Sequence, residues 1–300
     1  MHILTYAPWG AEGIIIRVET DLRRGIPGID ISGLAEGAVR EARERVRASF
    51  RNSGFEFPHD RILINLAPAD VRKEGAALDL SIAISVMAAS GVVTIQNNLM
   101  VLGELELSGR VRPVKGTLAA LSAGLKAGIY EYIVPLENSN EAAVLPNASF
   151  FAAATLAEAV HALKVKMETG KLPGNSTEEM SNGGSDRVNI CGDFSEVQGQ
   201  SRYKRALEIA AAGGHNILVF GPPGSGKTML ARRFPSIMPP LEPEEAVEVT
   251  RLHSLAGQIP TTGVSVYGQS GLITEPPFRS PHHSASTEGI LGGGRTIRPG

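Results

Sequence analysis

One octet of the sequence constrains the fold more than any other stretch, namely Gly221-Pro222-Pro223-Gly224-Ser225-Gly226-Lys227-Thr228. It fits the phosphate-loop pattern G-x-x-x-x-G-K-[ST], in which glycines allow successive backbone N–H groups to point at an anion. In this pattern the lysine reaches the β- and γ-phosphates of a nucleotide, and the threonine hydroxyl coordinates Mg²⁺. The octet therefore predicts a phosphate-binding loop between a strand and a helix.

The residues on either side of the octet have the patterns that such a loop requires. The apolar run Asn-Ile-Leu-Val-Phe at 216–220 is typical of a short buried strand, and the run at 229–234 is typical of the start of a helix. A phosphate at the start of that helix meets unpaired N–H groups. We therefore predict that residues 221–228 bind ATP and that Thr228 is a ligand of the accompanying Mg²⁺.

The composition is that of an ordinary soluble protein, with 42% hydrophobic and 20% charged residues. The formal net charge of −2 provides no overall field that would attract nucleic acid or a membrane. The single cysteine, Cys191, excludes an internal disulfide. The sequence has no signal-peptide pattern at its start and no run of about twenty apolar residues, so we expect a cytoplasmic protein without membrane contact.

The 300 residues divide into two predicted domains and a linker. Residues 1–167 alternate strand-like with helical runs. Residues 168–192 are rich in Gly, Pro, Asn and Ser and predict a flexible linker. Residues 193–300 contain the phosphate loop. Within the first domain we predict strands at 13–19, 28–32, 61–66, 101–107, 110–114, 132–135 and 149–152, and helices at 36–52, 78–89, 118–127 and 155–163.

Two of the predicted helices have informative faces. The helix at 78–89 is apolar almost all round, which places it in the interior of its domain. The helix at 36–52 carries a basic stripe of Arg40, Arg43, Arg47 and Arg51. Such a stripe can contact phosphates. A solvated face with exposed ion pairs is the favoured interpretation, because glutamates precede arginines by four residues, as Glu41 precedes Arg45.

Charged and histidine residues of the second domain give weaker signals. Arg202, Lys204 and Arg205 flank a helix before the phosphate loop, where a solvated face is the default interpretation. The adjacent His282 and His283 have no cysteine or carboxylate partner nearby in the sequence. On a strand their side chains would point in opposite directions, which argues against a metal site and leaves their role open.

Seven stretches, at 43–48, 52–58, 65–70, 73–75, 206–216, 221–228 and 278–283, together carry a family resemblance. The sequence resembles bacterial magnesium-chelatase-like AAA+ ATPases of the ComM (YifB) type over nearly its whole length. The resemblance implies an α/β fold: an N-terminal domain similar to the Lon protease domain, which is ribosomal S5 domain 2-like, followed by the first part of a P-loop AAA+ domain with a parallel sheet. It also implies that Gln200 approaches the adenine or ribose of ATP.

The same resemblance implies a hexameric DNA motor, similar to a branch-migration helicase that supports natural transformation and recombination. It does not imply proteolysis. Lon-type proteases have a serine shortly after a Lys-Asp-Gly-Pro stretch and a lysine in the helix after a Gly-x-Val-x-Pro strand. This sequence has Ala77 and Leu118 near those positions, and neither can attack a carbonyl or accept a proton. We therefore predict an inactive Lon-like domain.

ATP hydrolysis in this family needs an apolar strand that ends in paired carboxylates and an arginine from a neighbouring subunit. No such strand follows Lys227, because Glu242, Glu244 and Glu245 lie in a helical pattern. We therefore expect the sequence to be truncated before the Walker B and arginine-finger elements, to hydrolyse ATP poorly by itself, and to leave part of its core exposed. The alternatives are a non-hydrolysing nucleotide-binding module or regulatory partner, and a magnesium-chelatase ATPase subunit.

Overall fold

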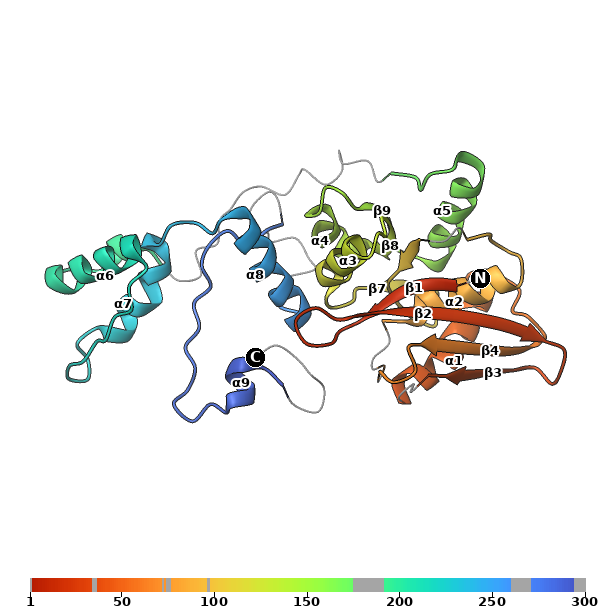
Figure 1. Ribbon diagram of the computed structural model, residues 1–300, viewed down its shortest axis with the longest axis horizontal. Helices are drawn as coiled ribbons and strands as arrows, with labels where there is room; N and C mark the ends of the chain where they lie inside the picture. The colour runs from red at the N-terminus through yellow and green to blue at the C-terminus, as the bar shows by residue number, and fades with distance from the viewer. Residues whose placement is uncertain are drawn as a thin grey trace.

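The computed structural model describes residues 2–33, 37–71, 73, 77–95, 98–174, 192–259 and 271–293. Its main feature is a seven-stranded sheet with the order β3-β4-β2-β1-β5-β8-β9 (Figure 1). The strands are β1 (His2–Ala7), β2 (Ile14–Arg23), β3 (Gly28–Ser32), β4 (Arg61–Ala67), β5 (Leu99–Val101), β8 (Glu131–Pro135) and β9 (Ser149–Ala153). β2 pairs antiparallel with β1 and β4, whereas the other four neighbouring pairs are parallel.

Helices cover the sheet on both faces and give a mixed α/β domain, as predicted. Helices α1 (Gly37–Asn52), α2 (Asp79–Ala89) and α5 (Leu156–Thr169) share one hydrophobic cluster with the sheet. Helix α3 (Thr117–Lys126) and the short α4 (Ser139–Ala143) belong to a second cluster. Side chains along β1 point alternately to the two faces of the sheet and so to the two clusters. Ile3 belongs to the first cluster, and Leu4 and Tyr6 belong to the second.

Helix α2 is the interior helix that its sequence predicts. Every residue from Asp79 to Met87 is buried. The one carboxylate among them is paired: Nε of Arg45 in α1 lies 2.6 Å from Oδ2 of Asp79, and the backbone N–H of Leu105 donates to the same oxygen at 3.4 Å. Burial nevertheless raises the pKa of Asp79 to about 6, because the arginine offsets only part of the desolvation.

The strand predicted at 101–107 is divided in the structure. β5 ends at Val101, and β6 (Glu104–Leu105) pairs with β7 (Val111–Arg112) in a separate two-stranded sheet. Gly103 makes the break, because its φ is 154° and an added Cβ would lie 2.8 Å from Cγ1 of Val111. Its carbonyl accepts from the N–H of Leu80, so the chain leaves the main sheet to meet α2. Strand β1 was not among the predictions.

The described residues from 192 onward contain helices and loops but no strand. Their elements are the 3₁₀ helices η3 (Phe194–Glu196) and η4 (Phe234–Ile237), and the α-helices α6 (Ser201–Gly213), α7 (Lys227–Arg233), α8 (Pro243–Ala256) and α9 (Thr287–Leu291). The prediction of a strand at 216–220 is therefore wrong for this structure. A strand needs neighbours for its backbone N–H and C=O groups, and the described chain places none beside this segment.

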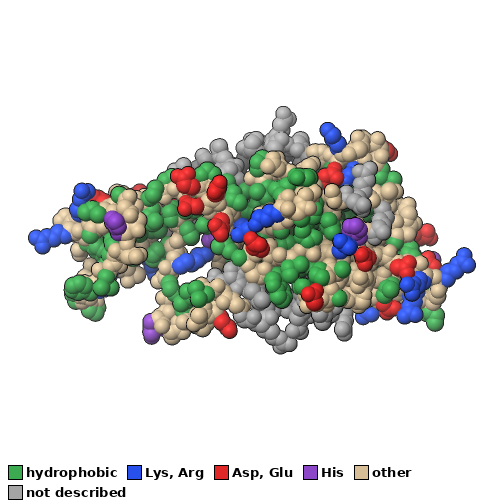
Figure 2. Space-filling model, viewed as in Figure 1, with side chains coloured by type: hydrophobic (Ala, Val, Ile, Leu, Met, Phe, Trp, Pro, Cys, Tyr) green, Lys and Arg blue, Asp and Glu red, His purple; other side chains and the backbone are tan. Residues whose placement is uncertain are grey.

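The side chains of this segment are exposed, as the prediction of an uncovered core requires. Leu218 and Phe220 are each 89% exposed. Figure 2 shows hydrophobic side chains on the surface at the end of the molecule where α6, α7 and their connection lie.

Helix α8 packs away from the phosphate loop, onto α3 of the sheet domain (Figure 1). A buried polar network fixes the contact. The hydroxyl of Ser254 donates to Oε2 of Glu141 at 2.6 Å, Asn138 Nδ2 donates to Oε1 at 2.9 Å, and the N–H of Leu118 donates to Oε2 at 3.2 Å. Burial raises the pKa of Glu141, and these hydrogen bonds offset part of that rise. One buried carboxyl thus joins the two parts of the chain.

Most of the predicted linker, residues 175–191 with Cys191, lies outside the described residues, so the domain boundaries stay predictions. Within the described parts of the chain, no helix combines the length and the apolar character that a membrane span requires.

Candidate nucleotide-binding site

The predicted phosphate loop connects an extended segment to α7. Its turns depend on glycine at two places, because Gly224 and Gly226 have φ values of 79° and 83°, where residues with a Cβ are strained. The hydroxyl of Ser225 donates to the carbonyl of Pro222 at 2.9 Å and closes the loop. Gly226 is the residue before α7, so the helix begins at Lys227.

The ammonium group of Lys227 lies inside the loop. Nζ donates to the carbonyls of Gly221 at 2.8 Å and Pro222 at 2.7 Å, and lies 3.3 Å from Oγ of Ser225. The backbone N–H groups of Gly224 and Gly226 donate to no group in the described part of the chain. Unpaired amides and a cationic group therefore belong to one short loop, and together they are a donor set that suits phosphate oxygens.

A small apolar cluster supports the loop from behind. Leu230 of α7 is fully buried against three side chains: Phe194 of η3, Val197 just after η3, and Leu207 of α6. Near the end of α7 an ion pair adds to this packing, since a guanidinium nitrogen of Arg233 lies 2.9 Å from Oε2 of Glu196. The phosphate loop is therefore held by α6 and η3 rather than by a sheet.

Helix α6 brings two polar side chains to the loop. The side-chain amide of Gln200, the residue before α6, donates to the carbonyl of Ser225 at 3.4 Å, so this predicted residue does lie beside the loop. The hydroxyl of Tyr203 donates to the carbonyl of Lys227 at 3.5 Å. Tyr203 was not among the predicted site residues, because its helical spacing with apolar residues indicates only a packing role.

The remaining candidate residues lie as follows. Thr228 is exposed in the first turn of α7 and makes no hydrogen bond to a described group, so its hydroxyl is available to a metal. His282 and His283 do not point in opposite directions, because they lie in a turn rather than on a strand, and their ring centroids are 4.1 Å apart. No group of three metal-ligating side chains occurs among the residues that the structure describes.

Two of the three basic residues predicted to flank this helix, which lie within α6, have structural partners. Lys204 donates to the carbonyl of Val197 and lies over the ring of Phe194 at 5.8 Å, and Arg205 pairs with Glu208 at 3.0 Å. In the N-terminal domain, Ala77 directly precedes the buried start of α2, and Leu118 is fully buried in α3. Neither position offers a nucleophile or a base.

A phosphate loop supported by helices and joined to an α/β domain of this topology defines a class, the P-loop proteins with a Lon-like N-terminal domain. Two family models match the chain: subunit ChlI of Mg-chelatase over residues 18–138, and magnesium chelatase, subunit ChlI, over residues 193–300. The chain is 40% identical over 298 residues to YifB of Escherichia coli K12, and 37% identical over 304 residues to competence protein ComM of Haemophilus influenzae. It therefore belongs to the ComM/YifB-type family of magnesium-chelatase-like AAA+ proteins.

These two matches cover 99% of this chain, but 56% of YifB and 57% of ComM, so the chain spans little more than half the length of these relatives. The N-terminal domain alone has a second similarity. Over 151 residues, 48% of this chain, it is 22% identical to the Lon protease of Geobacter metallireducens and covers 18% of that protein. This similarity supports the Lon-like fold of the first domain.

Proposed function

We propose that this chain binds ATP with Mg²⁺ through residues 221–228 and forms the nucleotide-binding part of a ring-shaped ATPase that acts on DNA. The observation that carries the proposal is the position of Lys227, whose ammonium lies in the loop beside the unpaired amides of Gly224 and Gly226. Phosphate oxygens would take over the hydrogen bonds that the loop carbonyls now accept from Lys227.

Each residue of the site has one role in this proposal. The loop amides and Lys227 bind the phosphates, and Thr228 is positioned to coordinate Mg²⁺, which would neutralise phosphate charge when bound. Gln200 and Tyr203 hold the loop against α6 and approach the nucleoside side. Hydrolysis needs an acidic strand and an arginine finger besides these groups. We propose that this chain binds ATP but turns it over poorly by itself.

Family membership supports the DNA-directed part of the proposal. The relative from Haemophilus influenzae is named a competence protein. Membership of an AAA+ family also supports an oligomeric assembly. We propose that the full-length protein forms a hexamer that drives branch migration of DNA during transformation or recombination. Porphyrin metallation by a chelatase subunit is less well supported, because YifB and ComM match the Lon-like domain and the phosphate loop together. We further propose that this Lon-like domain has no peptidase activity.

The test is binding of a fluorescent ATP analogue with Mg²⁺ to the chain, compared with Lys227→Ala and Thr228→Ala. We expect Lys227→Ala to weaken binding at least tenfold, and Thr228→Ala to remove most of the Mg²⁺ dependence. The matched control is Lys164→Ala, which changes an exposed lysine of α5 that has no partner among the described residues. Equal affinity of the wild type and Lys227→Ala would refute the site.

Phosphate release, measured in parallel with and without branched DNA, tests the second half of the proposal. We expect no turnover above that of Lys227→Ala. A turnover that Lys227→Ala abolishes would contradict the proposal, because the chain would then contain a catalytic carboxylate that its sequence pattern does not reveal.

A further inference from the structure

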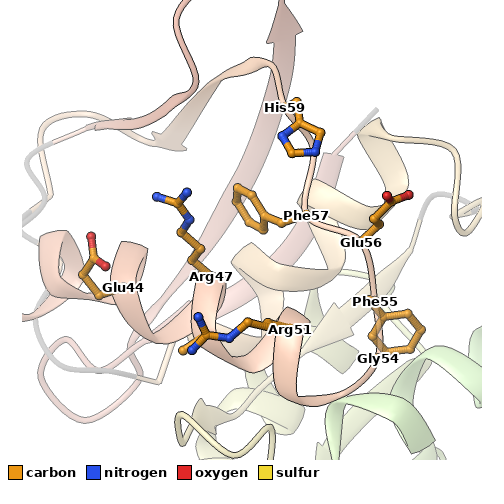
Figure 3. A pocket seen from close by; sticks show the side chains of 9 residues that line it. Glu44, Arg47, Arg51, Gly54, Phe55, Glu56, Phe57 and His59 are labelled. Atoms are coloured by element: carbon orange, nitrogen blue, oxygen red, sulfur yellow. The ribbon is translucent and has the colours of Figure 1, made fainter.

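The N-terminal domain has a pocket whose lining residues lie far from the phosphate loop in the sequence. It is a cavity of about 660 Å³ between α1 and the segment at 54–59, which is large enough for a nucleotide-sized group. In Figure 3, Arg47 and Arg51 project from α1, while Phe57 and His59 lie on the segment across the cavity. No residue of this pocket takes part in the site at Lys227.

The two arginines of this pocket differ from two other arginines of α1, Arg43 and Arg45. Arg43 donates to the carbonyl of Ile29, and the neighbouring Arg45 pairs with Asp79. Arg47 and Arg51 are exposed, lie one turn apart and make no ion pair or hydrogen bond within the described part of the chain. The solvated-pair interpretation of the basic stripe therefore does not account for these two guanidinium groups, whose forked donors match phosphate oxygens.

The opposite wall provides aromatic surface that the core holds in place. The ring of Phe57 packs edge-on against the buried Phe50, with centroids 5.1 Å apart and an interplanar angle of 73°. Phe55 is likewise partly buried against the core cluster. Both rings line the cavity. Partly exposed aromatic faces beside cations are the elements that bind unstacked bases in single strands.

Two carboxylates in the pocket restrict the ligand further. Glu44 and Glu56 are exposed and lack a partner among the described residues. They would repel a uniformly anionic polymer such as an acidic peptide. A nucleotide unit presents a phosphate to the arginines. Cytosine, adenine and guanine also carry amino groups, which can donate a hydrogen bond to a carboxylate. The mixed charge of the pocket thus favours nucleic acid over other polyanions.

We propose that this pocket binds single-stranded nucleic acid, with a phosphate on Arg47 and Arg51, a base against Phe57, and the amino group of that base on Glu56. The inference rests on the proposed function in that DNA is the partner. The proposed nucleic-acid site lies elsewhere in the chain than the proposed ATP site and does not need ATP, so either proposal can fail without the other.

The first experiment measures the fluorescence anisotropy of a labelled 12-nucleotide oligo(dC) with the whole chain, without ATP or Mg²⁺. We expect Arg47→Gln/Arg51→Gln to weaken binding at least tenfold and to reduce the salt slope by about 1.4, as expected for two lost phosphate contacts. The charge-matched control is Arg17→Gln/Arg24→Gln, two exposed arginines of the same domain without described partners. We expect it, and Lys227→Ala, to remain within twofold of the wild type. Equal losses in both double variants would overturn the site.

The second experiment asks whether bases are recognised. Oligo(dC) should bind several-fold more tightly than oligo(dT), and Glu56→Gln should remove this preference. Phe57→Leu, which keeps apolar volume but removes the aromatic face on which the base is proposed to lie, should weaken the binding of both oligonucleotides. The proposal is overturned if a duplex of the same sequence binds as tightly as the single strand. It is also overturned if poly-L-glutamate of equal charge displaces the oligonucleotide as well as unlabelled oligo(dC) does, because the pocket would then recognise charge alone.

Discussion

The buried pair of Arg45 and Asp79 should make the stability of the N-terminal domain fall as the pH rises, and one substitution should make this dependence steeper. The side chain of Asp79 is 1% exposed and that of Arg45 is 21% exposed. The pKa of Asp79 rises from 3.8 to about 6 on folding. That rise corresponds to about 3 kcal/mol. Because the raised pKa favours the protonated folded state, this group stabilises the fold below pH 4, and that contribution is lost as the pH rises through 6.

Replacing Arg45 by Met removes the cation that compensates the ionised carboxylate. Near pH 8 we expect a loss of about 3–5 kcal/mol in the free energy of unfolding. This is the usual cost of removing one partner of a buried ion pair, because the other charge stays buried without compensation. Near pH 5 Asp79 is largely protonated already, so only a hydrogen bond to a neutral group is lost, about 1 kcal/mol. The loss caused by Arg45→Met should therefore shrink by a factor of about three between pH 8 and pH 5.

Urea unfolding followed by Trp9 fluorescence measures this difference. Trp9 is the only tryptophan and lies in the connection between β1 and β2, so its signal reports on the N-terminal domain. Arg51→Met, at an exposed position of the same helix, is the control and should change the unfolding free energy by less than about 0.5 kcal/mol at either pH. Asp79→Asn should restore much of the stability of Arg45→Met at pH 8. An equal loss at pH 5 and pH 8 would refute the reasoning, because the arginine would then act through the packing of its stem.

Three further predictions concern other parts of the chain. Since burial raises the pKa of Glu141, the stability from this group is lost as the pH rises through its folded value; Glu141→Gln should therefore gain in Tm relative to wild type from pH 5 to pH 8, and a pH-independent difference would contradict this. Leu218→Ser/Phe220→Ser should leave the unfolding free energy within about 0.5 kcal/mol of wild type and reduce the fluorescence of an apolar dye, whereas a large destabilisation would mean that these exposed side chains are packed in solution. Ala77→Ser should not release peptides from casein, because the buried Leu118 cannot accept the proton of the new serine; cleavage absent from wild type would show a functional base there.

The sequence predicted the fold best where the pattern is local. These are elements whose buried positions recur at regular spacing, or that are buried on all sides. The strand expected at 61–66 is β4, the helix expected at 36–52 is α1, and the apolar helix at 78–89 is α2. In each case the burial pattern follows from spacing alone. The turn at 221–226 and the helix that follows it were equally predictable, because the pattern resides in eight consecutive residues; nucleotide binding there stays a prediction.

The failures have a different physical origin, since each depends on what lies beside the segment. The run at 216–220 has the composition of a strand, yet a strand exists only where neighbours pair with its backbone. The break at Gly103 depends on the approach of Leu80 and Val111, which come from other elements. The pocket at Arg47 and Arg51 forms because the segment at 54–59 faces α1, which helical spacing does not show.

Helix α8 shows most clearly what such non-local packing adds. Its sequence predicts a helix with carboxylates in the first turn, and nothing in that pattern indicates that its last turn lies on α3. Yet Ser254 of α8 supplies one hydrogen bond to Glu141, while Asn138 and Leu118 of the sheet domain supply the others. A carboxyl buried this deeply is stable only when its partners are present. Any movement of α8 would therefore disturb the environment of Glu141, because it would remove the hydrogen bond from Ser254.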